Sequence, residues 1–298
     1  MALRKKIIID TDTGIDDAMA ILMALEAHKR KAVEVIAVTA VSGNTTEPDA
    51  ERNILRTLDA AGCGDIPVYK GAEEALVIPY PHEEHYHGED GFNNVKFPTS
   101  PDMRRINKEP AWNAISRLSK EYPHEITIVA IGPLTNVALA MKTDPGLAER
   151  LREMFIMGGN IEGYGNVTEA AEFNFHADPE AAYIVLRLTR CPTMIAPWEL
   201  SYKYNKVDFG WRTEVLGKLT TPAAQLINAC EEVIISIITG SVHKSTFELV
   251  YINTELQAGI CFGGHIEPCK GLLKKKKKQA GAELGQAQLP TGIWLYCD

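Results

Sequence analysis

The stretch "KKIIIDTDTGIDDAMAILMALEA" (residues 5–27) carries four aspartates within eight residues, directly behind a run of isoleucines. The apolar run is typical of a buried strand, and the apolar residues that recur after Gly14 predict a helix over about 15–27. The carboxylates therefore lie between a strand and a helix. Like charges this close repel one another, and the repulsion grows where water is partly excluded. We expect a positive group to sit among them.

The same alternation of strand and helix continues along most of the chain. Expected strands lie at 5–10, 33–41, 66–71, 125–131, 154–159 and 191–197, and expected helices at 15–27, 48–62, 108–121, 134–142, 178–188 and 221–238. This pattern predicts an α/β fold, with an open, mostly parallel sheet flanked by helices and a Rossmann-like core.

The ends of the expected strands indicate where a site would form. Parallel sheets of this type bind ligands beyond the carboxyl ends of their strands. Asp10, Asn44, Ile131 and Met157 fall at or just past such ends, which makes them candidates to share one pocket. A polar loop at 80–94, rich in His, Gly and Asn, is long enough to be functional.

Composition and charge exclude several classes of protein. The net charge is −8, and residues 1–269 alone carry −12 because the six Lys of 270–298 outweigh two acids there. An acidic body argues against a nucleic-acid-binding surface. No apolar run reaches the roughly 18 residues of a membrane span, and the apolar run that ends at Asp10 is too short for a signal peptide. We therefore expect a cytoplasmic protein with no membrane partner.

The aspartate cluster has two further interpretations besides a cation site. Helix capping by Asp16, with the other acids in solvent, would need no ligand. A phosphatase of the haloacid-dehalogenase type also begins Asp-x-Asp after a hydrophobic strand, but Gly14 stands where that motif has Thr or Val. An EF-hand fails because its twelfth position is Ile21 rather than Glu. Oxygen ligands without nearby His or Cys favour Ca²⁺ or Mg²⁺.

The regular pattern fails after about residue 240. We expect an α/β domain over residues 1–240 and an atypical, partly disordered segment over 241–298, which contains a five-lysine run and a Gly/Ala/Gln-rich tail.

Several motifs resemble those of the inosine–uridine-preferring nucleoside hydrolases. They occur in the family's order over roughly residues 5–200: "IIIDTDTGIDDAMAI" (7–21), "VSGNTT" (41–46), "HGEDG" (87–91), "VAIGPLTNVALA" (129–140), "FIMGGN" (155–160) and "GNVTEAAEFNFHADPEAA" (165–182). The first and the last of these are specific. The resemblance implies hydrolysis of the N-glycosidic bond of ribonucleosides around a bound Ca²⁺, in purine or pyrimidine salvage. It also implies a small-molecule nucleoside substrate and a homodimer or homotetramer.

The resemblance implies a role for individual residues. The implied roles are calcium binding (Asp12, Asp17 and the carbonyl of Ile131), deprotonation of the attacking water (Asp10), binding of ribose hydroxyls (Asp16, Asn44, Glu172 and Asn174), contact near the 5′-hydroxyl (Asn166), lining of the sugar site (Met157) and protonation of the leaving base (His87). For His87 an exposed loop histidine is an equal alternative. Asn136 and Thr135 are expected to cap or pack their helix.

The chain departs from the family in its C-terminal third. Family members carry a further calcium-binding aspartate there, and we find no counterpart in this sequence; His243, for example, is followed by Lys244. Loss of a metal ligand predicts reduced calcium affinity and reduced or absent turnover. A non-catalytic relative that binds nucleoside or ribose is therefore an alternative function.

Overall fold

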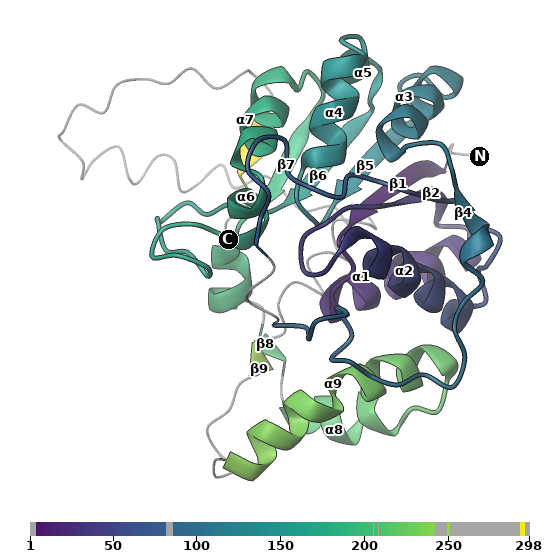
Figure 1. Ribbon diagram of the computed structural model, residues 1–298, viewed down its shortest axis with the longest axis vertical. Coiled ribbons are helices and arrows are strands. Elements are labelled where there is room, and N and C mark those ends of the chain that lie inside the picture. The colour runs from purple at the N-terminus through teal and green to yellow at the C-terminus, as the bar shows by residue number, and fades with distance from the viewer. Residues whose placement is uncertain are drawn as a thin grey trace.

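A single parallel sheet forms the centre of the protein (Figure 1). The computed structural model describes residues 4–81, 86–204, 206–207, 209–241, 249–250 and 293–295. Eight strands pair in the order β10-β7-β6-β5-β1-β2-β3-β4, and every pairing is parallel. Their bounds are Lys5–Thr11 (β1), Val33–Ala40 (β2), Val68–Tyr69 (β3), Ile106–Asn107 (β4), Ile126–Ala130 (β5), Glu153–Met157 (β6), Thr193–Ala196 (β7) and Ile293–Leu295 (β10). The predicted α/β fold class is confirmed.

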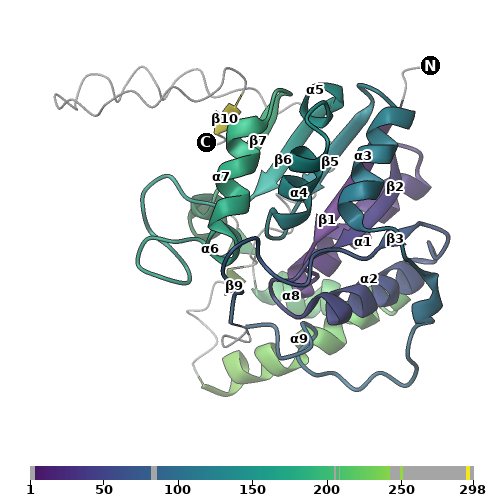
Figure 2. The same cartoon turned by 45° about the horizontal axis from the view of Figure 1, so that its top comes forward.

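Helices cover both faces of the sheet (Figure 2). One face carries α1 (Ile15–Lys29) and α2 (Glu47–Ala61), and the other carries α3 (Ala111–Glu121), α4 (Thr135–Thr143), α5 (Leu147–Arg150) and α7 (Pro179–Leu188). Successive side chains of a strand point to opposite faces. Ile7 and Ile9 of β1 accordingly pack with α1 and α2, whereas Ile8 packs with the helices of the other face. The central strand is thus buried on both sides, as its unbroken apolar run predicts.

The remaining elements lie around this core. They are η1 (Met103–Arg105), α6 (Phe173–Ala177), a π-helical turn η2 (Leu200–Tyr204), α8 (Phe209–Glu214), η3 (Leu216–Lys218), α9 (Pro222–Ser241) and a two-stranded antiparallel pair of β8 (Lys206–Val207) and β9 (Leu249–Val250). Helix α9 packs beside α1 and α2 (Figure 1) through a small apolar cluster. Its members are Ile15, Ala18, Phe92, Leu226, Ile227 and Cys230.

Local sequence signals explain where several helices begin and end. Helix α2 begins at Thr46, whose hydroxyl accepts a hydrogen bond from the Asp49 amide, and it ends at Gly62, which has a φ of 67°. Helix α7 begins at Asp178, whose carboxylate accepts from the Ala181 amide at 2.9 Å, with Pro179 at its first position. The predicted end at Gly62 and the predicted start at Asp178 are therefore confirmed.

Two strands differ from the sequence-based expectation. Strand β4 was not predicted from the sequence, because its two residues are too few to give a periodic signal. Ile293–Leu295 were expected to be part of a disordered tail but form β10, which pairs with β7 at the edge of the sheet. Residues 242–248, 251–292 and 296–298 lie outside the described residues, so the expected domain boundary near residue 240 stays a prediction.

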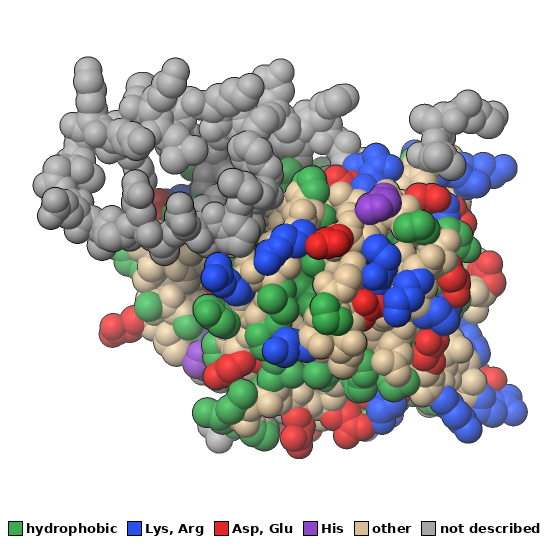
Figure 3. All heavy atoms as spheres, turned by 90° about the horizontal axis from the view of Figure 1, so that it is seen from above, with side chains coloured by type: hydrophobic (Ala, Val, Ile, Leu, Met, Phe, Trp, Pro, Cys, Tyr) green, Lys and Arg blue, Asp and Glu red, His purple; other side chains and the backbone are tan. Residues whose placement is uncertain are grey.

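The surface view in Figure 3 shows Lys and Arg side chains interspersed with Asp and Glu on the face that it presents. Among the helices of the described part, none combines the length and the apolar character that crossing a membrane requires.

Candidate active site

A pocket of about 390 Å³ opens at the carboxyl edge of the sheet. Nine of the eleven residues to which the resemblance assigns a role line it: Asp16, Asp17, Asn44, His87, Ile131, Met157, Asn166, Glu172 and Asn174. They come from the ends of β5 and β6, the start of α1, the segment after β2, the loop between β3 and η1, and the segment that leads into α6 and begins it. Asp10 and Asp12 do not line the pocket and are fully buried. Of the four residues expected at strand ends, three thus share this pocket.

Asp12 and Asp17 are held by backbone amides next to the pocket. Asp12 Oδ2 accepts a hydrogen bond from the Asn44 amide at 2.6 Å, and Asp17 Oδ2 accepts from the Gly14 amide at 2.8 Å. The Asn44 side chain also donates to Asp17 Oδ2 at 3.4 Å. Asp17 thus caps the first turn of α1 while it faces the pocket, and Asn44 connects the two acids.

Asp10 stands at the end of β1 with its two oxygens in different environments. Its Oδ1 accepts hydrogen bonds from the Thr39 hydroxyl at 2.5 Å and from Asn136 Nδ2 at 2.8 Å. Its Oδ2 has no hydrogen-bond partner. One oxygen of the carboxylate is therefore saturated with donors, and the other is a buried acceptor without a donor.

The segment around α6 supplies the opposite wall of the pocket. Glu172 is the N-cap of α6, and its carboxylate accepts from the amides of Gly159 (2.7 Å), Asn174 (3.0 Å) and Phe175 (3.1 Å). Asn174 Nδ2 donates to the carbonyl oxygens of Ile131 (3.1 Å) and Met157 (3.2 Å). These contacts connect α6 to the ends of β5 and β6.

Asn166 lies in the loop before α6. Its Oδ1 accepts a hydrogen bond from the Phe173 amide at 2.8 Å, which fixes the side chain at the pocket wall.

Burial raises the pKa of the site carboxyls well above their ordinary values. Desolvation is the largest cause for each: it raises the pKa of Asp10, Asp12 and Glu172 to about 7. The pKa of Asp17 is also raised, first by desolvation and then by the neighbouring charges of Asp12 and Asp16. Such a group of acids is stable in the ionised form only when a positive charge compensates it.

The donor set fits a hard divalent cation. Asp10 Oδ2, Asp12 Oδ1 and Asp16 Oδ1 are buried oxygens without a hydrogen-bond donor. Gly43 lies directly against Asp12. A Cβ added at position 43 would lie only 2.2 Å from Asp12 Oδ2. No three His, Cys, Asp or Glu side chains in the described ranges form a complete metal-binding group. The fit therefore rests on unpartnered carboxylate oxygens together with carbonyl oxygens such as that of Ile131.

His87 is buried rather than exposed. Its exposed fraction is 7%, its Nδ1 accepts from the Ile15 amide at 3.4 Å, and its Nε2 lies 3.4 Å from Asp16 Oδ1. Burial lowers the pKa of the imidazole, although the charge of Asp16 acts in the opposite direction. The interpretation of His87 as an exposed loop histidine is wrong, because the ring packs against the start of α1.

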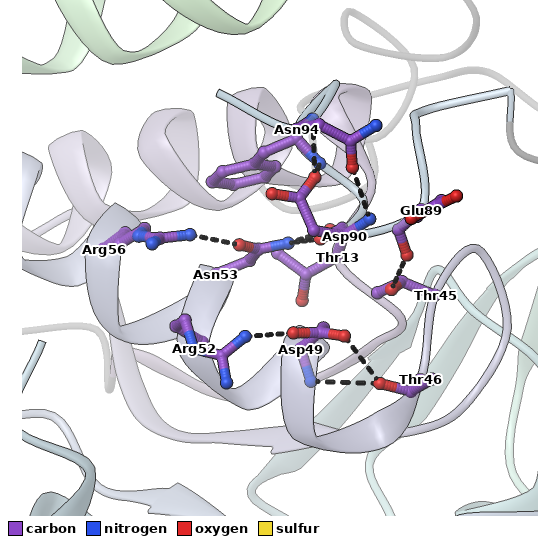
Figure 4. A network of polar contacts seen from close by, with 11 residues as sticks. Thr13, Thr45, Thr46, Asp49, Arg52, Asn53, Arg56, Glu89, Asp90 and Asn94 are labelled. Carbon is purple, nitrogen blue, oxygen red and sulfur yellow. Dashed lines mark hydrogen bonds and ion pairs between the residues drawn. The ribbon is translucent and has the colours of Figure 1, made fainter. Parts of the chain in front are cut away.

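The loop that carries His87 is anchored to α2 (Figure 4). Asn53 Nδ2 donates to the carbonyl of Asp90 at 2.7 Å, and the Thr45 hydroxyl donates to the carbonyl of Glu89 at 2.8 Å. Farther along, Asn93 Nδ2 donates to a backbone carbonyl of α9 at 2.6 Å. The described part of this polar loop is thus fixed over the pocket from two helices.

Sequence reasoning missed an aromatic part of the pocket. The additional lining residues are Tyr86, Val167, Phe173, Trp198 and Tyr202. Trp198 follows the end of β7, so the rule that found the other strand-end residues could have found it as well. Tyr86 lies on a loop, Phe173 begins the five-residue helix α6 and Tyr202 lies in the short turn η2, and segments this short give no periodic signal.

Asn136 and Thr39 were not expected to touch a site residue. Asn136 does not cap α4, whose N-cap is Leu134, and it contacts Asp10 instead. Thr135 donates its hydroxyl to Asp178 Oδ2 at 2.7 Å and so ties α4 to the start of α7.

Comparison with known proteins agrees with this architecture. A uridine nucleosidase of rice, described as probable, is 43% identical over 182 residues, which cover 61% of this chain and 53% of the relative. The inosine-uridine preferring nucleoside hydrolase of Crithidia fasciculata is 39% identical over 192 residues, covering 64% of this chain and 59% of the relative. Each match spans little more than half the length of the relative.

Solved structures show the same fold. A plant nucleoside hydrolase superposes with a TM-score of 0.76 at 32% identity, over 87% of this chain and 79% of the other. The open parallel sheet with helices on both faces is thus the fold of a nucleoside hydrolase. A sequence model described as "Inosine-uridine preferring nucleoside hydrolase" matches residues 7–260, and the chain belongs to this family.

Proposed function

We propose that this protein hydrolyses the N-glycosidic bond of ribonucleosides to free base and ribose with the help of a bound Ca²⁺. The observation that carries the proposal is the group of buried acids with raised pKa values and unpartnered oxygens beside a pocket of about 390 Å³. Family membership and relatives with this activity in their names support it.

Asp10 is the general base in this proposal. Its pKa of about 7 lies near neutral pH, where a base combines a large ionised fraction with sufficient proton affinity. Its Oδ2 has no hydrogen-bond partner, and in this proposal it would accept the proton once water reaches it from the pocket. Breaking the ribosyl–base bond passes through an oxocarbenium-like state with positive charge on the sugar. The carboxylates of Asp16 and Glu172 would stabilise this charge more than they stabilise the neutral substrate.

The remaining pocket residues would hold the sugar. Asp16, Asn44, Glu172 and Asn174 would bind its hydroxyls, Asn166 would lie near the 5′-hydroxyl, and Met157 would line the sugar site. Asp12, Asp17 and the carbonyl of Ile131 would bind Ca²⁺. The ion would neutralise these acids, orient the sugar diol and the attacking water, and make that water more acidic.

His87 stays a candidate general acid. With its pKa lowered by burial, the imidazole is neutral at pH 7 in the free protein. Donation of a proton to the leaving base would therefore need proton uptake when substrate binds. Protonation of this kind is worth roughly 10²–10⁴-fold in rate.

A non-catalytic nucleoside- or ribose-binding protein is the second candidate function. The proposed calcium site has only two carboxylate ligands, Asp12 and Asp17, and no complete acidic cluster occurs within the described ranges. Calcium affinity and turnover would then be reduced or lost. The phosphatase interpretation has no support from the family assignment.

One assay separates these functions. The protein is incubated with a mixture of nucleosides, with Ca²⁺ or with a chelator, and free base is measured. Calcium-dependent base release supports the hydrolase, and its disappearance in Asp10→Asn assigns the activity to this site. Ribose-dependent thermal stabilisation without base release would support the binding protein and would contradict the hydrolase. Phosphate release from phosphoesters would contradict both.

A further inference from the structure

One buried carboxylate at the carboxyl edge of the sheet has no part in the proposed function. Glu199 follows the end of β7, is 2% exposed and does not line the pocket. Its Oε1 accepts hydrogen bonds from two successive backbone amides, those of Ile161 (2.8 Å) and Glu162 (2.7 Å). Hydrogen bonds to a charged acceptor are stronger than bonds between neutral groups. Glu199 is therefore a strong anchor for the segment that it contacts.

This segment is the first arm of loop 158–172, which connects β6 to α6 and projects from the sheet beside α6 (Figure 2). All residues of the loop are described, and they form neither helix nor strand. A second contact holds the same arm, because the Trp198 amide donates to the carbonyl of Gly159 at 2.9 Å. Without ladder hydrogen bonds of its own, the loop depends on such contacts for its conformation.

The two arms of the loop are connected to each other. Asn160 Nδ2 donates to the carbonyl of Ala170 at 2.8 Å. Asn160 directly precedes the two amides that Glu199 holds, and Ala170 lies near the end of the second arm. A displacement of the first arm would therefore move the second arm as well.

The second arm carries a residue of the pocket. It folds into a turn in which the amides of Gly165 and Asn166 donate to the carbonyls of Glu169 (3.0 Å) and Ala171 (3.1 Å). Asn166 lines the pocket from this turn. A continuous chain of contacts thus runs from Glu199 through both arms of the loop to Asn166.

We propose that Glu199 is a positioning residue for recognition of the 5′ end of the sugar, which holds loop 158–172 so that Asn166 reaches the 5′-hydroxyl. This inference rests on the proposed function, in which Asn166 lies near that hydroxyl. Lys203 also contacts the loop, through an ion pair with Glu162 at 2.5 Å. Both partners of this pair are partly exposed, and such pairs contribute little to stability.

The test measures kcat/KM for two substrates, the nucleoside that the wild-type protein cleaves fastest and its 5′-deoxy analogue. Loss of one neutral hydrogen bond corresponds to about 3–10-fold. We expect Glu199→Ala to lower kcat/KM for the nucleoside by this factor. The value for the analogue should change less than about twofold, because the analogue lacks the hydroxyl in question.

Three further variants complete the comparison. Glu199→Gln keeps an oxygen acceptor for the two amides and should restore most of the preference for the 5′-hydroxyl. Asn160→Ala breaks the link between the arms without removing a buried carboxylate, and it should show the same selective loss as Glu199→Ala. The control Glu169→Ala removes an exposed carboxylate from the same loop and should keep the preference.

Amide hydrogen exchange gives a readout that does not depend on turnover. In Glu199→Ala the amides of Ile161 and Glu162 should exchange faster, and so should those of Gly165 and Asn166, while the amides of β6 keep their protection. In Asn160→Ala the amides of Gly165 and Asn166 should exchange faster.

Two results would overturn the inference. One is an equal loss of kcat/KM for both substrates in Glu199→Ala and Asn160→Ala, and the other is unchanged exchange at Gly165 and Asn166 in Glu199→Ala. If the wild-type protein releases no base from any nucleoside, the proposed function fails. The exchange at these two amides then still decides whether Glu199 holds the turn that carries Asn166.

Discussion

Replacing Asp10 by Asn should stabilise the cation-free protein at neutral and high pH. Burial raises the pKa of this carboxyl from its ordinary value of 3.8 to about 7. Each pKa unit corresponds to about 1.4 kcal/mol, so keeping Asp10 ionised costs up to about 4 kcal/mol of folding free energy. The new amide N–H₂ would stand where Oδ2 now has no partner. Leaving this donor unpaired would cost about 1–3 kcal/mol and offset part of the stabilisation. A net gain of about 1–3 kcal/mol at pH 8 follows.

The dependence on pH gives the sharper test. Because the folded pKa is raised, the folded protein binds more protons than the unfolded chain between about pH 4 and pH 7. The contribution of Asp10 to stability is therefore fully present below pH 4 and is lost as the pH rises to about 7. Asn does not titrate. The stability difference between Asp10→Asn and wild type should grow across this window by up to about 4 kcal/mol and stay constant above it.

Urea denaturation between pH 4.5 and pH 8 in the presence of a chelator measures this difference. Asp65→Asn, which removes an exposed carboxylate, is the matched control, and its stability should stay close to that of the wild type. A difference that stays flat across the window, or a less stable Asp10→Asn at pH 8, would refute the claim that burial of this carboxylate is costly.

Three further outcomes are expected. Added Ca²⁺ should raise the Tm of the wild-type protein at pH 7.5, and Asp17→Asn should abolish most of that increase; equal increases in both would contradict the assignment of the calcium site. Gly43→Ala, which places a Cβ against Asp12, should also abolish the calcium response in thermal melts. The control is Gly163→Ala, whose added Cβ has no atom within contact distance. It should cost only the strain of a positive φ, about 1–2 kcal/mol, and should keep the calcium response. Arg212→Met should cost about 3–5 kcal/mol in urea denaturation because it leaves the buried carboxylate of Glu231 without this guanidinium partner; a loss below about 1 kcal/mol would show that the pair adds little.

The order of strands and helices was predictable because it depends on local periodicity. Buried strands of a parallel sheet read as short apolar runs, and helices read as longer segments with Gly or Asp–Pro signals at their ends. The two-residue strand β4 and the distant strand β10 have no such signal. Pairing of Ile293–Leu295 with β7 depends on a contact across about a hundred residues, and no local pattern records it.

The sequence by itself determined that carboxylates gather at the carboxyl edge of a parallel sheet. Asp10 and Asp12 follow a buried strand, and that placement depends only on chain order and on the direction of the strands. Only the tertiary structure decided which oxygen of Asp10 is free. Its donors, Thr39 and Asn136, lie 29 and 126 residues away, and hydrogen bonds over such separations become visible only once the chain is folded.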